Sequence, residues 1–109
     1  MKDEKPGESD TLYEAILSLK DLDECKRFFS DLCTVYELRA MSQRFEVAML
    51  LSQGMIYNDI LERTGASSAT ISRVNRSLHY GANGYQTVIP RIRVREEAGG
   101  KQEDGNDKL

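Results

Sequence analysis

The stretch IYNDILERTGASSATISRVNRSL, residues 56–78, predicts two short helices joined by a three-residue turn. An apolar stripe marks the first helix: Tyr57, Ile60 and Leu61. Gly65 ends that helix at a point where a left-handed backbone is needed, which glycine adopts at little cost. Ser67 then supplies a hydroxyl that can cap the second helix. This order of elements predicts a helix-turn-helix.

The second helix of this stretch has two contrasting faces. Ile71, Val74 and Leu78 recur at the three-and-four spacing of a buried stripe. The opposite face is polar: Ser68, Ser72, Arg73, Asn75 and Arg76. A small, hydroxyl-rich face that carries arginines suits docking in a DNA major groove.

Charge is distributed unevenly along the chain. Its 109 residues, 39% of them hydrophobic, predict one domain with a modest core, and the net charge of -3 does not favour nucleic acid. Residues 63–95, however, contain no Asp, Glu or Lys. Six arginines give that run a charge of +6: Arg63, Arg73, Arg76, Arg91, Arg93 and Arg95. The pattern predicts a basic functional face on an acidic body.

Three capping-box pairs predict three amphipathic helices before residue 54: Thr11 with Glu14, Asp21 with Glu24, and Thr34 with Glu37. Their apolar stripes are broad and rich in phenylalanine and methionine. Two arrangements fit, an intrachain bundle and packing against a second copy of the chain. We favour the homodimer, because phenylalanine and methionine side chains make the adaptable interfaces that homodimers use.

The ends of the chain predict less structure. Residues 1–9 are charged and are expected to form a flexible arm before a helical domain at residues 10–92. Pro90 is expected to stop a short helical turn by Ile89. Residues 93–109 are charged and contain glycine, so they are expected to be a disordered tail.

Composition limits the chemistry and the location. Cys25 and Cys33 are eight residues apart and are expected to stay reduced, and a single histidine argues against a metal site; no cofactor is expected. No segment approaches the roughly 20 apolar residues of a membrane span, and the N-terminus has no apolar signal core. We expect a cytoplasmic protein that contacts no membrane.

The run 34–81, and within it the signature RTGASSATISRVNRSLHYG, resembles the tryptophan-repressor superfamily and its tryptophan-repressor-like branch. The resemblance implies an all-α fold in which two chains intertwine through their N-terminal helices. Each subunit would present a helix-turn-helix, residues 56–78, to successive major grooves. Half-sites would then lie about one DNA turn, roughly 34 to 36 Å, apart.

The resemblance also assigns contacts with DNA. The expected set is Asn58, Ser67, Ser68, Ala69, Thr70, Ser72, Arg73 and Arg76. Small residues at the start of the second helix suit water-mediated or methyl contacts with base edges. Asn58 stands where the tryptophan repressor has a base-contacting arginine, so the preferred sequence should differ. Arg63, Arg76 and the cluster Arg91, Arg93 and Arg95 are candidates for phosphate contacts.

An effector pocket is the part of the resemblance that this sequence alters. The residues that match it are Gln43, Arg44, Arg73, Val74 and Ser77. Val74 replaces a glycine on which tryptophan packs in the family, and Gln43 replaces an arginine. We therefore expect no tryptophan binding, while an unknown small-molecule effector and ligand-independent DNA binding both remain open.

These observations predict a dimeric, sequence-specific DNA-binding transcriptional regulator that acts as a repressor. The alternative is a module of the same fold that serves protein interaction or replication without recognising promoters. An enzyme is not expected, because His79 stands alone and no pair of carboxylates or nucleophile with a base is evident.

Overall fold

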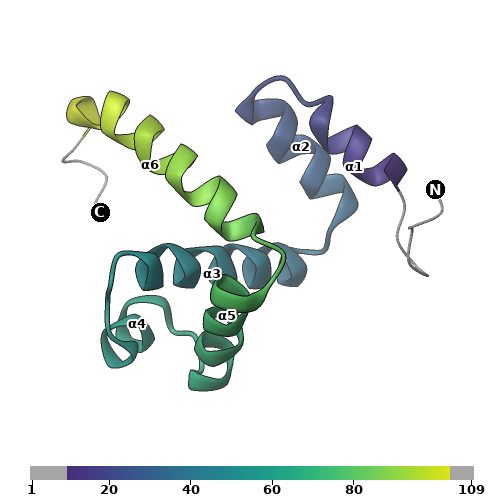
Figure 1. Cartoon of the computed structure of the whole chain (residues 1–109). Coiled ribbons are helices and arrows are strands. Elements are labelled where there is room, and N and C mark those ends of the chain that lie inside the picture. The colour runs from purple at the N-terminus through teal and green to yellow at the C-terminus, as the bar shows by residue number, and fades with distance from the viewer. Residues whose placement is uncertain (1–9, 104–109) are drawn as a thin grey trace. The chain divides into compact units, whose positions relative to one another are not determined.

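The computed structural model describes residues 10–103, with side chains described to residue 93. This part of the chain is all-α (Figure 1): α1 Asp10–Leu17, α2 Leu22–Leu32, α3 Val35–Ser52, α4 Tyr57–Thr64, α5 Ser68–Tyr80 and α6 Gly84–Glu103. The chain divides into two compact units, Met1–Ala40 and Met41–Leu109, with the boundary inside α3. No helix within residues 10–103 is both long and apolar enough to cross a membrane.

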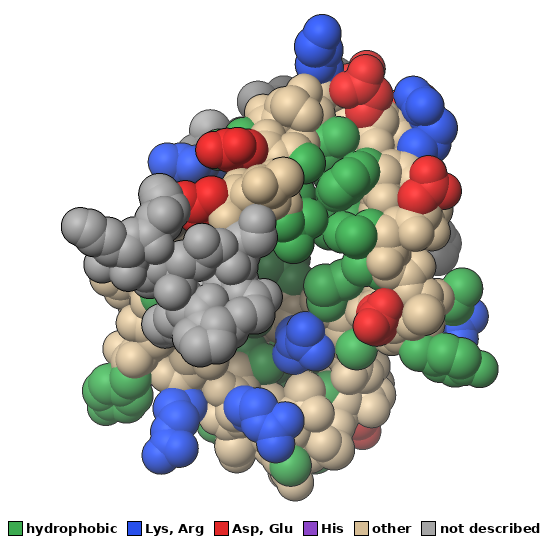
Figure 2. Space-filling view, turned by 90° about the vertical axis from the view of Figure 1, so that its right-hand side faces the viewer, with side chains coloured by type: hydrophobic (Ala, Val, Ile, Leu, Met, Phe, Trp, Pro, Cys, Tyr) green, Lys and Arg blue, Asp and Glu red, His purple; other side chains and the backbone are tan. Residues whose placement is uncertain are grey.

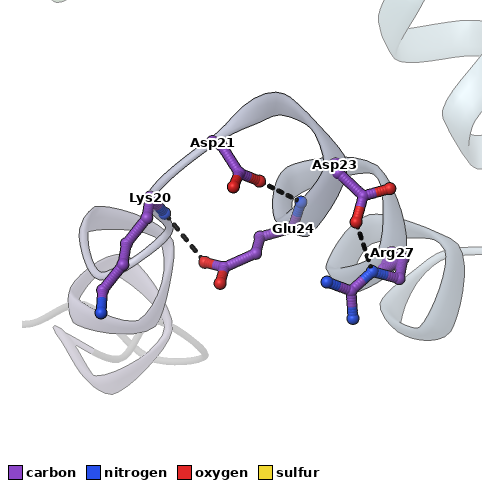
Figure 3. Close-up of polar contacts among 5 residues, drawn as sticks. All are labelled: Lys20, Asp21, Asp23, Glu24 and Arg27. Atoms are coloured by element: carbon purple, nitrogen blue, oxygen red, sulfur yellow. Dashed lines mark hydrogen bonds and ion pairs between the residues drawn. The ribbon is translucent and has the colours of Figure 1, made fainter.

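Local capping defines the helices of the first unit. Asp21 accepts a hydrogen bond from the Glu24 N–H (2.8 Å), and the Glu24 carboxylate accepts one from the Lys20 N–H (2.9 Å), as Figure 3 shows. Thr34 and Glu37 form a reciprocal box, with bonds of 3.0 and 2.8 Å. Both predicted helix starts are confirmed.

The start predicted at Thr11 is wrong by two positions, because a cap at Thr11 would make Leu12 the first helical residue. Helix α1 begins at Asp10, so Thr11 lies inside the first turn instead of preceding it. Asp10 is an acidic residue in the first turn, where the partial positive charge of a helix N-terminus favours a carboxylate. The predicted arm at residues 1–9 lies outside the described residues.

In the first unit, no side chain of α1 or α2 is buried. Its helices are nevertheless amphipathic, and large apolar side chains stay open to solvent: Leu12, Tyr13, Leu17, Leu22, Leu32, Val35 and Tyr36. Figure 2 shows hydrophobic side chains at the surface of this unit, between charged ones. Phe28 and Phe29 meet edge to face, with ring centroids 5.5 Å apart.

The second unit contains the buried core. Nine side chains compose it: Val47, Ala48, Leu50, Ile60, Ala66, Ile71, Val74, Leu78 and Ile89. They come from α3, from α4 and the turn that follows it, from α5 and from α6. The predicted buried stripe Ile71, Val74 and Leu78 is confirmed.

Helix α6 contradicts two predictions. It continues through Pro90 to Glu103, so it does not end by Ile89, and residues 93–103 are helical where a disordered tail was expected. Pro90 cannot donate to the carbonyl four residues earlier, but contacts with distant residues offset this loss. Ile89 is buried, and Arg93 donates to the Ser52 hydroxyl at the end of α3 (2.8 Å). Residues 104–109 lie outside the described residues.

Candidate nucleic-acid interface

The turn between α4 and α5 is fixed by its own side chains. Gly65 adopts the left-handed conformation (φ 75°), and its N–H bonds the Leu61 carbonyl, as the sequence predicts for a helix end. The Thr64 hydroxyl donates to the Ile60 carbonyl (2.7 Å) and accepts from the Ala66 N–H (3.0 Å). The path of the chain from α4 into α5 is therefore held by hydrogen bonds at consecutive residues.

Ser67 caps α5, as predicted. Its hydroxyl oxygen accepts the Thr70 N–H (3.1 Å) and its O–H donates to the Thr70 hydroxyl oxygen (3.1 Å). This exchange occupies the donor of Ser67 and leaves the Thr70 O–H available as a donor. The first turn of α5 contains no acidic residue, so the partial positive charge of its N-terminus is not offset there.

Helix α5 separates a core face from a solvent face. Ile71, Val74 and Leu78 are at most 7% exposed, whereas the residues between them are exposed except for half-buried Asn75. Seven of the eight predicted DNA contacts are exposed: Asn58, Ser67, Ser68, Ala69, Ser72, Arg73 and Arg76. Thr70 is half-buried beside its bond to Ser67. The exposed part of α5 thus offers hydroxyls and two guanidinium groups without a carboxylate on the same helix.

The other arginines of the acid-free run differ in availability. Arg63 and Arg91 are exposed and can meet a phosphate. Arg93 is half-buried, its guanidinium binds Ser52, and its Nε is buried without a hydrogen-bond partner. Arg93 therefore joins α6 to α3 instead of offering its charge to solvent. The side chain of Arg95 lies outside the described residues.

The predicted effector residues are divided between interior and surface. Val74 lies in the core, and half-buried Gln43 donates its side-chain amide to the Thr64 carbonyl (3.3 Å). Arg44, Arg73 and Ser77 are exposed. An open, shallow pocket does lie beside α4. Met55, Asp59, Glu62 and Arg63 line it, and none of these is a predicted effector residue.

One hydrogen bond between α6 and α5 was not predicted from the sequence. Gln86 of α6 donates its amide to the Leu78 carbonyl in the last turn of α5. Gln86 lies in the first turn of α6, four residues before Pro90, and its partner Leu78 is eight residues earlier in the chain. Metal chemistry has no support among the described side chains, where no three His, Cys, Asp or Glu residues are grouped to hold an ion.

Taken together, the architecture is that of an all-helical protein in which α4, a tight turn and α5 have the order of a helix-turn-helix and α5 exposes a face without acidic residues. The family model described as Trp repressor protein matches residues 8–93, which is most of the chain. The chain belongs to the Trp repressor family, a family of DNA-binding regulators.

Individual relatives agree with this assignment. The chain is 52% identical over 89 residues to the uncharacterized protein YerC of Bacillus subtilis (strain 168), a match that covers 82% of this chain and 86% of that protein. A TrpR-like protein from Eubacterium eligens ATCC 27750 has a solved structure that is similar with a TM-score of 0.74 and 59% identity, covering 76% of this chain and 86% of the other. A Trp repressor candidate from Staphylococcus aureus gives a TM-score of 0.75 and 47% identity, covering 78% and 85% of the two chains.

Proposed function

We propose that this protein is a sequence-specific DNA-binding transcriptional regulator that represses transcription as a homodimer through α4 and α5. The observation that carries the proposal is the two-sided α5. Ile71, Val74 and Leu78 are buried. Ser68, Ser72, Arg73 and Arg76 face solvent, and the helix contains no acidic residue. Membership of a family of DNA-binding regulators supports the same function.

The proposed DNA contacts divide into two roles. Ser68, Ala69 and Thr70 at the start of α5 contact base edges, directly or through water, and Asn58 of α4 reads an adenine. Arg73 and Arg76 bind phosphates, which sets the register without reading sequence. Small side chains at the base-reading positions also let the shape and deformability of the DNA contribute to specificity.

The homodimer is supported by the surface of the first unit. Leu17, Leu22 and Tyr36 are each more than two-thirds exposed, and α1 and α2 bury no side chain. Apolar surface of this extent is typical of an interface. We propose that a second copy covers it, so that the two α4–α5 pairs reach half-sites about one DNA turn, roughly 34 Å, apart.

Electrophoretic retardation on genomic fragments at two salt concentrations tests the proposal. We expect a subset of fragments to stay bound as salt rises. Replacing Arg73 and Arg76 together with alanine should weaken binding by about 100-fold and reduce the salt slope by about two counterions per subunit, because each arginine neutralises a phosphate. Lys26→Ala, which removes an exposed cation from α2, serves as the matched control and should leave binding nearly unchanged.

An interaction module of the same fold is the second candidate, and the net charge of -3 favours it. Such a module, including one that assists replication, would show no preference among fragments. Equal loss of all fragments as salt rises, with no difference between the double arginine variant and Lys26→Ala, would refute promoter-specific binding and leave this second candidate.

Regulation by tryptophan is not part of the proposal. Val74 is 2% exposed and packs in the core, so its side chain leaves no open slot at that position of α5. We expect isothermal titration of the protein with tryptophan to give no heat of binding at micromolar concentrations. A micromolar dissociation constant would contradict this expectation and return Gln43, Arg44, Arg73 and Ser77 to consideration as ligand contacts.

A further inference from the structure

Two glutamines from outside the α4–α5 pair each donate a hydrogen bond to a carbonyl in the last turn of one of its helices. Gln43 of α3 donates its amide to the carbonyl of Thr64, the last residue of α4. Gln86 of α6 donates its amide to the carbonyl of Leu78, in the last turn of α5. Each helix of the pair is therefore bound at its C-terminal end by a side chain from a different neighbouring helix.

These carbonyls belong to the backbone groups that a helix cannot satisfy by itself. The last four carbonyls of a helix lack a donor from the following turn. The Leu61 and Ser77 carbonyls receive the N–H groups of Gly65 and Gly81, both at 2.9 Å. The glutamines supply donors to carbonyls that follow these two along the chain, those of Thr64 and Leu78. Because a side-chain amide is neutral, neither bond places a charge in its partly buried site.

The bond from Gln43 also extends into the turn that precedes α5. Its acceptor, Thr64, uses its hydroxyl to hold the Ile60 carbonyl and the Ala66 N–H. Ala66 is 1% exposed, so the turn is anchored in the core on one side and by Gln43 on the other. A movement of the turn relative to α3 must break this connection.

We propose that Gln43 and Gln86 are positioning residues that hold α4 and α5 between α3 and α6, so that sequence-specific docking depends on them although neither lies on the exposed face of α5. The inference rests on the proposed DNA-binding function. Base contacts require an accurately placed helix, whereas phosphate contacts are less demanding of position. Loosening the two bonds should therefore reduce specificity more than it reduces general affinity for DNA.

The test compares Gln43→Met and Gln86→Met with the wild type. Methionine is similar in size and uncharged but has no donor. Gln53→Met, a replacement of an exposed glutamine beyond the end of α3, is the matched control. We expect each of the first two variants to bind a preferred genomic fragment about fivefold more weakly, the order of effect of one lost hydrogen bond. Affinity for a non-specific competitor duplex should stay within about twofold, since its phosphate contacts are unchanged.

The ratio of the two affinities separates positioning from ordinary stabilisation. A merely structural role would lower both affinities in parallel with the thermal midpoint, and an unchanged ratio would overturn the inference. If the wild type shows no preferred fragment, the proposed function fails and amide hydrogen exchange decides the glutamine bonds separately. Gly65 and Ala66 should then exchange faster in Gln43→Met and Gly81 faster in Gln86→Met, but not in Gln53→Met; equal exchange in all variants would overturn the inference.

Discussion

The two units of this chain use similar amphipathic helices in different ways. In the first, α1 and α2 bury no side chain, and Leu17 remains 84% exposed. In the second, α3 to α6 contribute nine side chains to a common core, among them the fully buried Ile60 and Ile71. Capping and patterning are thus alike in the two units, and they do not decide where the apolar face of a helix is buried.

The difference indicates that the units draw their stability from separate sources. Helices as short as α1 and α2, with 8 and 11 residues, are marginal in water without packing. The second unit supplies that packing from its own chain. The first unit needs surface from elsewhere, which the proposed second copy provides. Substitutions that compare the two units should therefore differ in how their effects depend on protein concentration.

The largest effect is expected in the core of the second unit. Ile60→Ala should reduce the free energy of unfolding by about 3 kcal/mol, because it removes a fully buried side chain and leaves a cavity. Ile56, at the start of the same helix, is 63% exposed, and Ile56→Ala should cost less than about 0.5 kcal/mol. Urea denaturation measures both. Similar losses for the two variants would contradict the placement of the core.

A smaller effect, sensitive to concentration, is expected in the first unit. Leu22 is 69% exposed in the single chain and begins α2. Leu22→Asp should weaken the homodimer by about 2 kcal/mol, the value of burying a leucine. An aspartate at a helix N-terminus is otherwise favourable, so any loss must come from the apolar contact. Sedimentation equilibrium should show more monomer.

Ser30→Asp is the control for that experiment, since it adds the same charge at an exposed position of α2. It should leave the monomer–dimer equilibrium nearly unchanged. Identical behaviour of Leu22→Asp and Ser30→Asp would show that no second copy covers Leu22, and the comparison between the units would then need another explanation.

Sequence reasoning succeeded where structure depends on neighbouring residues. The caps at Asp21, Thr34 and Ser67 and the left-handed Gly65 follow from local hydrogen bonding and backbone preference. The buried stripe of α5 follows from helical spacing, which also explains why the proposed DNA contacts are mainly exposed. Their role in DNA binding stays a prediction.

It failed where contacts join distant parts of the chain. Pro90 was expected to end a helix, but Arg93 reaches Ser52, 41 residues earlier, and Ile89 is buried. The hydrogen bond from Gln43 to the Thr64 carbonyl was not predicted either, while the assignment of Gln43 to an effector pocket stays a prediction. Spacing along a sequence contains no direct information about such pairs, so the bracing of α4 and α5 became visible only in three dimensions.

The smallest expected effects come from the helix caps, one in each unit. Ser67→Ala and Asp21→Ala each remove an oxygen that accepts a backbone N–H at a helix start, worth about 1 kcal/mol. Thermal unfolding at two protein concentrations tests both variants.

The loss from Ser67→Ala should be the same at the two concentrations, since α5 packs within its own chain. The loss from Asp21→Ala should appear fully only at the higher concentration if the proposed homodimer stabilises α2. Concentration-independent losses in both variants would mean that the first unit is stabilised within one chain.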